Sequence, residues 1–271
     1  MLQELPIAVI GSGVMGEAIF GGLVRQGLVA VEQVLVSDPR EERRHELQAR
    51  YGVQTSADNA VAVQWGRVVI FAVKPQQLKL VLPPLRGTLR ADALVISVVA
   101  GATLASLSAA LAHPAVVRSM PNTPAVIGAG MTVWTATPEV NATQLDWART
   151  VLGALGRELW VEAEAYLDMA TALNGSGPAY CFLIMEAMID AGVHLGLARP
   201  IAATLVQETM LGAARYAQQS GTHPAQLRNA VTSPGGTTAA AIAELERGGL
   251  RTVMADAIWA AYRRSVELGK V

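Results

Sequence analysis

The 271-residue sequence has little cysteine, few aromatic residues and no excess of either charge. Cys181 is the only cysteine, which excludes an intrachain disulfide and is typical of a reducing compartment, so we expect a cytoplasmic protein. The formal net charge is −1 and the chain has no polybasic or acidic tail, so no nucleic-acid partner is expected. The four histidines are scattered without ligand spacing, and the sequence therefore predicts no metal site.

The chain also lacks the patterns of a membrane span and of a signal peptide. Residues 93–112 carry no charge, but Ser97, Gly101 and Thr103 interrupt them, and the first half is rich in β-branched residues. A strand, a glycine turn and a helix fit this stretch better than a span does. The N-terminal segment has neither a basic region nor a small-residue cleavage site, so we expect no membrane partner.

Glycine is abundant, and near the N-terminus its spacing is specific. The run Ile7–Ile10 is apolar and β-branched, which is typical of a strand buried on both faces. Gly11, Gly13 and Gly16 follow with G-x-G-x-x-G spacing, ahead of a helix-like run at residues 17–25. The first glycine permits a tight turn, the second lets the backbone approach a pyrophosphate, and the third lets the helix pack against the strand. This context predicts a dinucleotide site, the alternative being an ordinary strand–turn–helix.

A second strand, Val34–Ser37, ends 21 residues after Gly16, where a dinucleotide fold reads the adenosine ribose. Two cofactor choices remain open there. Asp38 would accept a hydrogen bond from a 2′-hydroxyl, which favours NADH, whereas Ser37 and Arg40 would meet a 2′-phosphate, which favours NADPH. A turn with Asp-Pro chemistry is the simpler alternative.

Further strands are expected at residues 67–73, 94–98, 116–119, 131–136 and 158–161. Their alternation with helices predicts an α/β Rossmann domain, doubly wound around a mostly parallel sheet, over residues 1–162. Beyond this point the strand patterns stop, and helices that open with proline predict an all-α domain over residues 163–271. The nearly all-apolar helix expected at residues 179–195 requires burial on every side, so we expect this domain to form a dimer interface.

Two glycine-rich segments lie in this helical half, NGSGPAY at Asn174–Tyr180 and VTSPGGTT at Val231–Thr238. Each directly precedes a helix-like run. Free backbone N–H groups at the start of a helix form an anion site that suits a small carboxylate. By composition alone, the second segment fits equally well a loop whose threonine caps a helix.

The run VTSPGGTTAAAIAELE, preceded by LRNA, closely resembles the signature of the pyrroline-5-carboxylate reductase family. Other family segments are matched by IGSGVMGEAI near the N-terminus, AVKPQ at residues 72–76, RSMPNTPAVIGAG at residues 118–130 and NGSGPAY. The matches keep the order of the family and extend from Ile7 to about Val266, which is nearly the whole chain.

The resemblance implies an enzyme that reduces the cyclic imine of 1-pyrroline-5-carboxylate to L-proline, the last step of proline biosynthesis. It implies NADPH as the cofactor, with NADH as the alternative, and a homodimer that assembles further, up to a decamer. The C-terminal helical domain would carry the dimer contacts. Hydride addition to an imine requires two well-placed molecules and neither a metal nor a histidine.

The resemblance also implies site residues. Those expected to bind the cofactor are Gly11, Ser12, Gly13, Val14, Met15, Gly16, Ser37, Asn59, Ala72, Val73, Lys74, Pro75, Val98, Val99 and Ala100. Those expected to bind the substrate are Ser233, Gly235, Gly236, Thr237 and Thr238. Thr238 is the expected catalytic residue, because its hydroxyl would hydrogen-bond the ring nitrogen, and Asn59 favours NADPH.

Two other functions stay open. A related NADP-dependent imine or β-hydroxyacid reductase would use a lysine or an aspartate on the helical side, and Lys270 is the only lysine after residue 162. A non-catalytic NADPH sensor would keep the glycine loop at residues 11–16 without needing VTSPGGTT.

Overall fold

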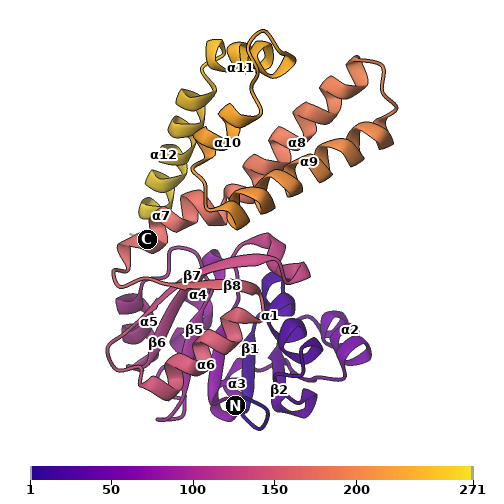
Figure 1. The fold of residues 1–271 in the computed structure, drawn as a ribbon. Coiled ribbons are helices and arrows are strands. Elements are labelled where there is room, and N and C mark those ends of the chain that lie inside the picture. Colours follow the sequence, from indigo (N-terminus) through magenta and orange to yellow (C-terminus); the bar gives the residue numbers. More distant parts are fainter. Residues whose placement is uncertain (1, 270–271) are drawn as a thin grey trace. The chain divides into compact units, whose positions relative to one another are not determined.

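A computed structural model describes residues 2–269 of the chain (Figure 1). The chain folds as two compact units. The first unit extends to Ser176 and also includes the segment that begins at Ala261, whereas the second unit is Gly177–Ala260. The domain boundary expected after residue 162 stays a prediction.

The first unit holds the strands and the helices between them. In chain order these are β1 (Ile7–Ile10), α1 (Val14–Arg25), β2 (Val34–Ser37), α2 (Glu41–Tyr51), β3 (Gln54–Ser56), α3 (Asn59–Trp65), β4 (Val68–Phe71), α4 (Pro75–Val81), β5 (Leu94–Ser97), α5 (Leu104–Leu111), β6 (Val116–Met120), β7 (Gly130–Ala136), α6 (Ala142–Gly153), β8 (Gly156–Trp160) and α7 (Ala165–Ala170). Short 3-10 turns lie at Val31–Gln33, Pro83–Leu85 and Thr123–Ile127, and a π-helical turn lies at Thr171–Gly175.

The strands form one eight-stranded sheet with the order β3-β2-β1-β4-β5-β6-β7-β8. Its first six positions reproduce the strand order of a doubly wound dinucleotide fold. Neighbouring strands are parallel except β6 and β7, which pair antiparallel. The predicted α/β class is therefore confirmed, as are the strands expected from the sequence. β3 was not predicted, because this edge strand has only three residues, all of them polar.

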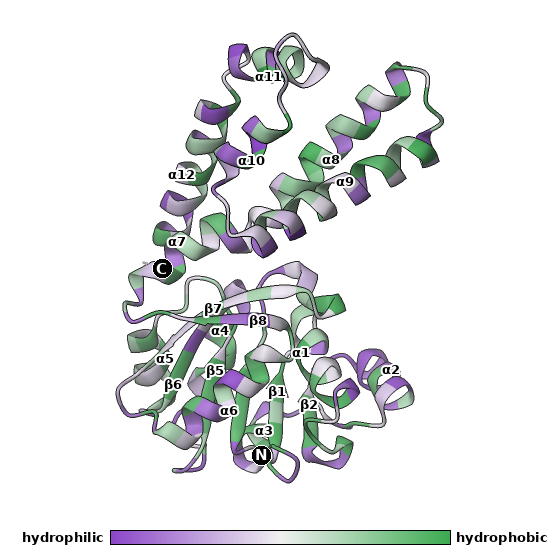
Figure 2. Ribbon diagram, viewed as in Figure 1, coloured by the Kyte–Doolittle hydropathy of each residue, from purple (hydrophilic) through white to green (hydrophobic). Residues whose placement is uncertain are grey.

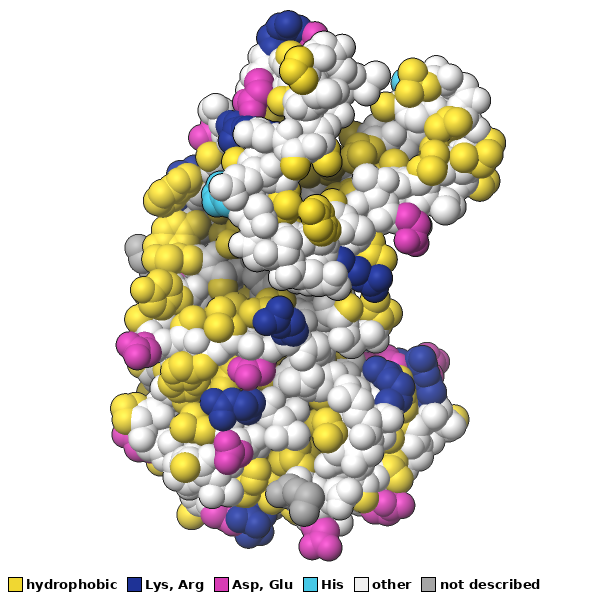
Figure 3. Space-filling model, in the orientation of Figure 1, with side chains coloured by type: hydrophobic (Ala, Val, Ile, Leu, Met, Phe, Trp, Pro, Cys, Tyr) yellow, Lys and Arg dark blue, Asp and Glu magenta, His cyan; other side chains and the backbone are white. Residues whose placement is uncertain are grey.

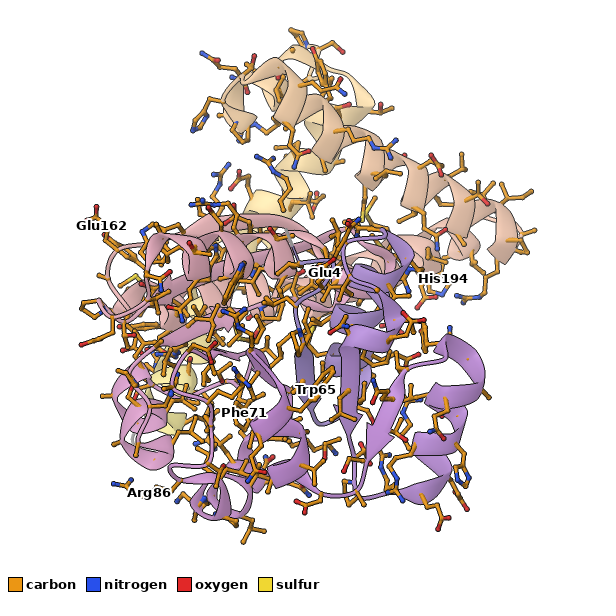
Figure 4. All side chains as sticks on the ribbon, turned by 90° about the horizontal axis from the view of Figure 1, so that it is seen from below. Glu4, Trp65, Phe71, Arg86, Glu162 and His194 are labelled. Carbon is orange, nitrogen blue, oxygen red and sulfur yellow. The ribbon has the colours of Figure 1, made fainter. Side chains whose placement is uncertain are left out.

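Both faces of the sheet are buried, since successive side chains of a strand point to opposite sides. On β1, Ile7 faces a core layer that also contains apolar residues of α1, α2 and α6. Ala8 faces the opposite layer, to which α3 and α5 contribute. Figure 2 shows the central strands as continuously hydrophobic. Phe71, at the end of β4, is fully buried within this unit, whereas Arg86 lies at its rim (Figure 4).

The helix ends follow local chemistry. α1 begins at Val14, three residues before the predicted start, with Gly13 as its N-cap. α2 ends at Tyr51, and its C-cap Gly52 has a φ of 73°, the left-handed conformation that glycine adopts without strain. The uncharged residues 93–112 form β5, a turn with Gly101 at φ 79°, and α5, as predicted. Within residues 2–269, no helix is long and apolar enough to cross a membrane.

The second unit is helical. Its elements are α8 (Gly177–His194), α9 (Arg199–Ser220), α10 (Pro224–Ala230), α11 (Thr237–Arg247) and the first part of α12 (Leu250–Leu268), whose last residues belong to the first unit. Pro178, Pro200 and Pro224 each lie in the first turn of a helix, as predicted. The absence of a side chain at Gly192 lets α8 approach α9 closely, because a Cβ there would lie 3.1 Å from the Cβ of Ala202.

Candidate functional site

The three glycines that follow β1 each have a geometric reason to be glycine. Gly11 has φ 93°, and a Cβ on it would lie 3.0 Å from the Ala72 carbonyl group. A Cβ on Gly16 would overlap the carbonyl oxygen of Gly11, so α1 packs directly on the turn. A Cβ on Gly13 would have no neighbour within 4 Å, because the space above this residue is open. The turn at Gly11 and the close packing at Gly16 agree with the roles predicted for these two glycines, and the pyrophosphate role of Gly13 stays a prediction.

The start of α1 is a suitable site for a phosphate group. The N-cap Gly13 has no side chain, so no capping side chain accepts a hydrogen bond from the first N–H groups of α1. The N-terminus of the 12-residue helix also carries the positive end of its dipole. An open space faces these donors above Gly13, and the residues present therefore fit the pyrophosphate of a dinucleotide.

The other segments predicted to bind the cofactor lie at the same edge of the sheet. Ile10, the last residue of β1, pairs with Ser37 of β2 and with Phe71 of β4, which in turn pairs with Ser97 of β5. The carboxyl ends of these adjacent strands thus bring together residues 11–16, Ser37, residues 72–75 and residues 98–100. Ligands of open parallel sheets bind at this edge.

Asn59 joins this edge although it comes from the start of α3. The hydroxyl of Ser37 donates to its Oδ1 at 2.7 Å. Asp58 caps α3 and accepts from the N–H of Ala60, which fixes the first turn of the helix and hence the position of Asn59. Lys74 is the N-cap of α4 and is exposed.

Asp38 lies directly after β2 and makes an unexpected contact with the glycine loop. Its Oδ2 accepts from the Ser12 hydroxyl at 2.6 Å and from the Ser12 N–H at 3.2 Å. Its two oxygens also accept from Nε and Nη2 of Arg40, at 2.9 and 3.0 Å. Burial alone would raise the pKa of Asp38, but hydrogen bonds from Arg40 and Ser12 outweigh it and hold that pKa well below its usual range. Asp38 is therefore a charged, buried link between β2 and the loop.

Arg43 is a supporting residue that the sequence did not indicate. It comes from the highly charged helix α2, but its side chain is only 15% exposed. Its Nε and Nη2 donate to the carbonyl oxygen of Ser12, at 3.1 and 3.0 Å, and its guanidinium also pairs with Glu17 of α1. No sequence signal identifies this role, because helical periodicity predicts a face and not the group that a long side chain reaches.

The segment NGSGPAY begins with Asn174, whose side chain pairs with that of Asn122. Nδ2 of Asn174, in the π-helical turn, donates to the carbonyl oxygens of Met120 and Met131, at 3.2 and 3.0 Å. Nδ2 of Asn122 donates to Oδ1 of Asn174 at 3.0 Å. These bonds hold the turn against the ends of β6 and β7, and they explain why amides suit both positions.

The VTSPGGTT segment lies in the second unit and forms a turn followed by α11. Gly235 has φ 69°, and the pair Pro234-Gly235 is the sequence signature of a type II turn. The N–H of Gly236 donates to the carbonyl oxygen of Ser233 at 3.1 Å, so it is already used within the turn.

α11 begins at Thr237, and its N-cap Gly236 provides no side-chain cap. The N–H groups of Thr237, Thr238 and Ala239 therefore remain as donors at the helix start within the described chain. The anion site expected before α11 stays a prediction, with these three N–H groups as its candidate donors.

A doubly wound unit with a phosphate loop, followed by a helical unit, defines the class of dinucleotide-dependent oxidoreductases. Residues 6–101 match the family model "NADP oxidoreductase coenzyme F420-dependent", and residues 164–268 match "Pyrroline-5-carboxylate reductase dimerisation". A pyrroline-5-carboxylate reductase of Synechocystis sp. is 44% identical to this chain over 99% of its length and 100% of the relative. The chain belongs to the pyrroline-5-carboxylate reductase family.

Solved structures agree with this assignment. A pyrroline-5-carboxylate reductase from Coxiella burnetii is similar with a TM-score of 0.90 and 38% identity, covering 99% of this chain and 100% of that one. A pyrroline carboxylate reductase from Plasmodium falciparum, solved with NADP bound, also has a TM-score of 0.90, at 28% identity, and the match covers 98% of this chain and 99% of that one.

Proposed function

We propose that this chain transfers hydride from NADPH, or alternatively NADH, to the C=N bond of 1-pyrroline-5-carboxylate and releases L-proline. The observation that carries the proposal is the similarity to a pyrroline-5-carboxylate reductase over nearly the whole of both chains. The open space above Gly13 supports the cofactor part of the proposal, and the uncapped start of α11 supports the substrate part. The enzyme would thus complete the biosynthesis of proline.

The chain contributes mainly by positioning. The bound dinucleotide supplies the hydride. The substrate carboxylate would accept hydrogen bonds from the N–H groups of Thr237 and Thr238, with the dipole of α11 favouring its charge. Gly235 and Gly236 shape the turn that leaves these donors open, and the Ser233 carbonyl holds that turn. Orientation of two bound molecules accounts for most of the expected acceleration.

Thr238 is the proposed catalytic residue, through a hydrogen bond from its hydroxyl to the ring nitrogen. A threonine hydroxyl is a poor general acid at neutral pH, so the proton would come from solvent or from an imine that is already protonated. We expect Thr238→Ala to lower kcat/KM by about 10- to 1,000-fold, since one strong contact is lost. Thr222→Ala is the matched control, because Thr222 lies in the loop before α10 and its hydroxyl bonds its near neighbour Ser220. Equal kinetics for both variants would remove Thr238 from the site.

One assay tests the function against its alternatives. The protein is mixed with NADPH and 1-pyrroline-5-carboxylate, and the absorbance of the reduced nicotinamide is followed. Loss of absorbance with the imine, without reduction of NADP by 3-hydroxy acids, is the expected result. Oxidation of 3-hydroxy acids would favour the β-hydroxyacid dehydrogenases, and NADPH binding without turnover of either substrate would favour a sensor.

We also propose a homodimer built through the second unit. α8 has no buried residue within the chain, although it is mostly apolar. Phe182 is 59% exposed and Leu183 is 66% exposed. Figure 3 shows hydrophobic side chains gathered over the α8–α9 hairpin. An apolar surface of this kind favours association with a second copy, in accord with the dimerisation family that matches residues 164–268.

Sedimentation tests the dimer. Leu183→Arg places a charge on this surface, and we expect it to shift the protein from dimer to monomer at micromolar concentration. Leu80→Arg is the control, because Leu80 is 77% exposed but belongs to α4 of the first unit. A monomeric wild type would contradict the proposal. We further propose that the dimers assemble up to a decamer and that the protein is cytoplasmic. The same sedimentation run measures the size of the assembly.

A further inference from the structure

The carboxyl end of β6 borders the second half of the cofactor edge. In a doubly wound fold each βαβαβ half binds one mononucleotide, so the nicotinamide half of a dinucleotide lies beyond the carboxyl ends of β4, β5 and β6. β6 pairs parallel with β5, with Arg118 opposite Ser97, and it continues two residues further to Met120. The chain that leaves β6 therefore borders the region in which a nicotinamide ring would lie.

Asn122 lies two residues beyond β6, and its side chain bonds the protein on three sides. Its Oδ1 accepts from the N–H of Met131 at 2.9 Å. Its Nδ2 donates to Oδ1 of Asn174 at 3.0 Å and to the carbonyl oxygen of Asn174 at 3.3 Å. Both N–H groups of this amide are therefore used. The side chain joins the segment after β6 to the start of β7 and to the π-helical turn.

Asn174 completes the arrangement from the π-helical turn. Its Nδ2 donates to the carbonyl oxygens of Met120 and Met131, which uses both N–H groups of the second amide as well. The two amides together connect the last residue of β6, the second residue of β7 and the turn. We call the side chains of Asn122 and Asn174 the asparagine brace.

The backbone around the asparagine brace is also tied to the predicted cofactor segment at residues 98–100. The hydroxyl of Ser119, which precedes Met120 in β6, donates to the carbonyl oxygen of Ser97 at 2.9 Å. On the other side, the N–H of Ser176 donates to the carbonyl oxygen of Thr171 at 2.9 Å, which is the i→i+5 bond of a π turn. Single π turns are rare and occur frequently at functional sites.

We infer that Asn122 and Asn174 are positioning residues for the nicotinamide half of the cofactor, because their brace fixes residues 120–122 as one wall of its site. Both amides have spent their donors on the protein, so they act through the backbone that they hold. Displacement of reacting groups by about 1 Å can lower a rate about 100-fold, so a fixed wall matters for hydride transfer. The inference rests on the proposed function only in assuming that a nicotinamide dinucleotide is the ligand of the glycine loop.

Binding with and without the nicotinamide tests the inference. NADPH and ADP-ribose 2′-phosphate, which is the same cofactor without its nicotinamide, are titrated into the full-length protein by calorimetry. NADH and ADP-ribose form a second pair, and imine reduction is measured in parallel. The variants are Asn122→Ala, Asn174→Ala and the double variant. Asn122→Ala is the milder change, because it leaves the two bonds from Asn174 to Met120 and Met131 in place.

Asn141→Ala is the matched control. Asn141 caps α6 and forms a capping box with Gln144. It follows β7, whose last residue Ala136 pairs with Val117 near the start of β6, so it comes from the opposite edge of the sheet. Loss of such a cap lowers stability without touching the cofactor edge, and the variant therefore separates destabilisation from mispositioning. Melting temperatures verify that each variant is folded.

We expect the wild type to bind NADPH at least about tenfold more tightly than ADP-ribose 2′-phosphate, since a well-placed nicotinamide adds contacts. Asn122→Ala and Asn174→Ala should lower this ratio to within about threefold of one and keep the affinity for ADP-ribose 2′-phosphate within about twofold. They should also lower kcat by about 10- to 100-fold. The double variant should lose no more than about twofold beyond Asn174→Ala, because the two amides act as a unit. Asn141→Ala should keep the ratio and kcat within about twofold.

Three results would overturn the inference. The first is a wild type that binds the two ligands equally, because its nicotinamide is then not held. The second is a pair of brace variants that keep the wild-type ratio or that weaken both ligands equally. The third is an Asn141→Ala protein that loses the ratio as they do. The proposed function fails separately: a protein that shows the ratio and its loss but does not reduce the imine refutes the reaction and leaves the inference standing.

Discussion

Replacement of Gly16 by alanine gives a sharp test of the packing between α1 and the glycine loop. The new Cβ would lie less than 3.0 Å from the Gly11 carbonyl oxygen and 3.4 Å from the Cβ of Ala72. Both neighbours are held by the sheet, so the backbone of the loop or of α1 must move. Overpacking of a closely packed region costs about 1–3 kcal/mol, and the clash with backbone places this case near the upper end.

The net effect of Gly16→Ala is smaller than the clash itself, because alanine favours a helix interior over glycine by about 1 kcal/mol. We therefore expect a loss of about 2 kcal/mol, which lowers the melting temperature of a unit of this size by about 4–8 °C. NADPH binding should weaken as well, since the displaced loop no longer presents its N–H groups in the same geometry.

Gly13→Ala is the matched comparison. Its Cβ meets no atom within 4 Å, so the melting temperature should change by less than about 2 °C. The same Cβ occupies the space in which a pyrophosphate would lie, and NADPH affinity should fall at least about tenfold. Circular dichroism melts and a fluorescence titration with NADPH measure both quantities. The reasoning is refuted if Gly13→Ala melts far below the wild type, or if Gly16→Ala keeps both its melting temperature and its affinity.

Two further predictions concern buried charges in the first unit. The side chain of Arg118 is 5% exposed and pairs with Glu164 at 2.9 Å and with Asp168 at 3.0 Å. Arg118→Leu leaves these two partly solvated carboxylates without their cationic partner. We therefore expect it to lower the free energy of unfolding by about 2–4 kcal/mol. Urea titration measures this loss, and Arg90→Leu, which breaks an exposed pair, should cost less than about 1 kcal/mol. Because the folded-state pKa of Asp38 lies below its ordinary value of 3.8, its contribution to stability is present above about pH 4 and is lost as the pH falls further. The stability difference between the wild type and Asp38→Asn should therefore shrink below about pH 4 in acid titrations, and a constant difference would contradict this.

The local patterns of the sequence were sufficient for most of the fold. β1 and the glycine loop were predictable because a buried strand, a turn and a helix start each depend on a few adjacent residues. β3 was missed because three polar residues at a sheet edge have no hydrophobic pattern. The start of α1 was placed three residues late, because its first turn belongs to the glycine motif itself.

The candidate site was predictable only as a set of segments. Parallel strands in a doubly wound order bring their carboxyl ends to one edge, so residues 11–16, 72–75 and 98–100 were expected to meet, as they do. The role of Asp38 was undecidable from sequence, since it depends on a hydrogen bond to Ser12, which lies 26 residues earlier in the chain.

The sequence by itself determined the alternation of strands and helices, the glycine loop and the turn before α11, because backbone freedom and hydrophobic periodicity are properties of short segments. Only the tertiary structure decided which donors fill the carboxylate of Asp38, where the guanidinium of Arg43 ends, and which N–H groups at α11 remain open. Hydrogen bonds form between groups that folding brings within about 3 Å, and the identity of those groups is not encoded in the spacing of either partner alone.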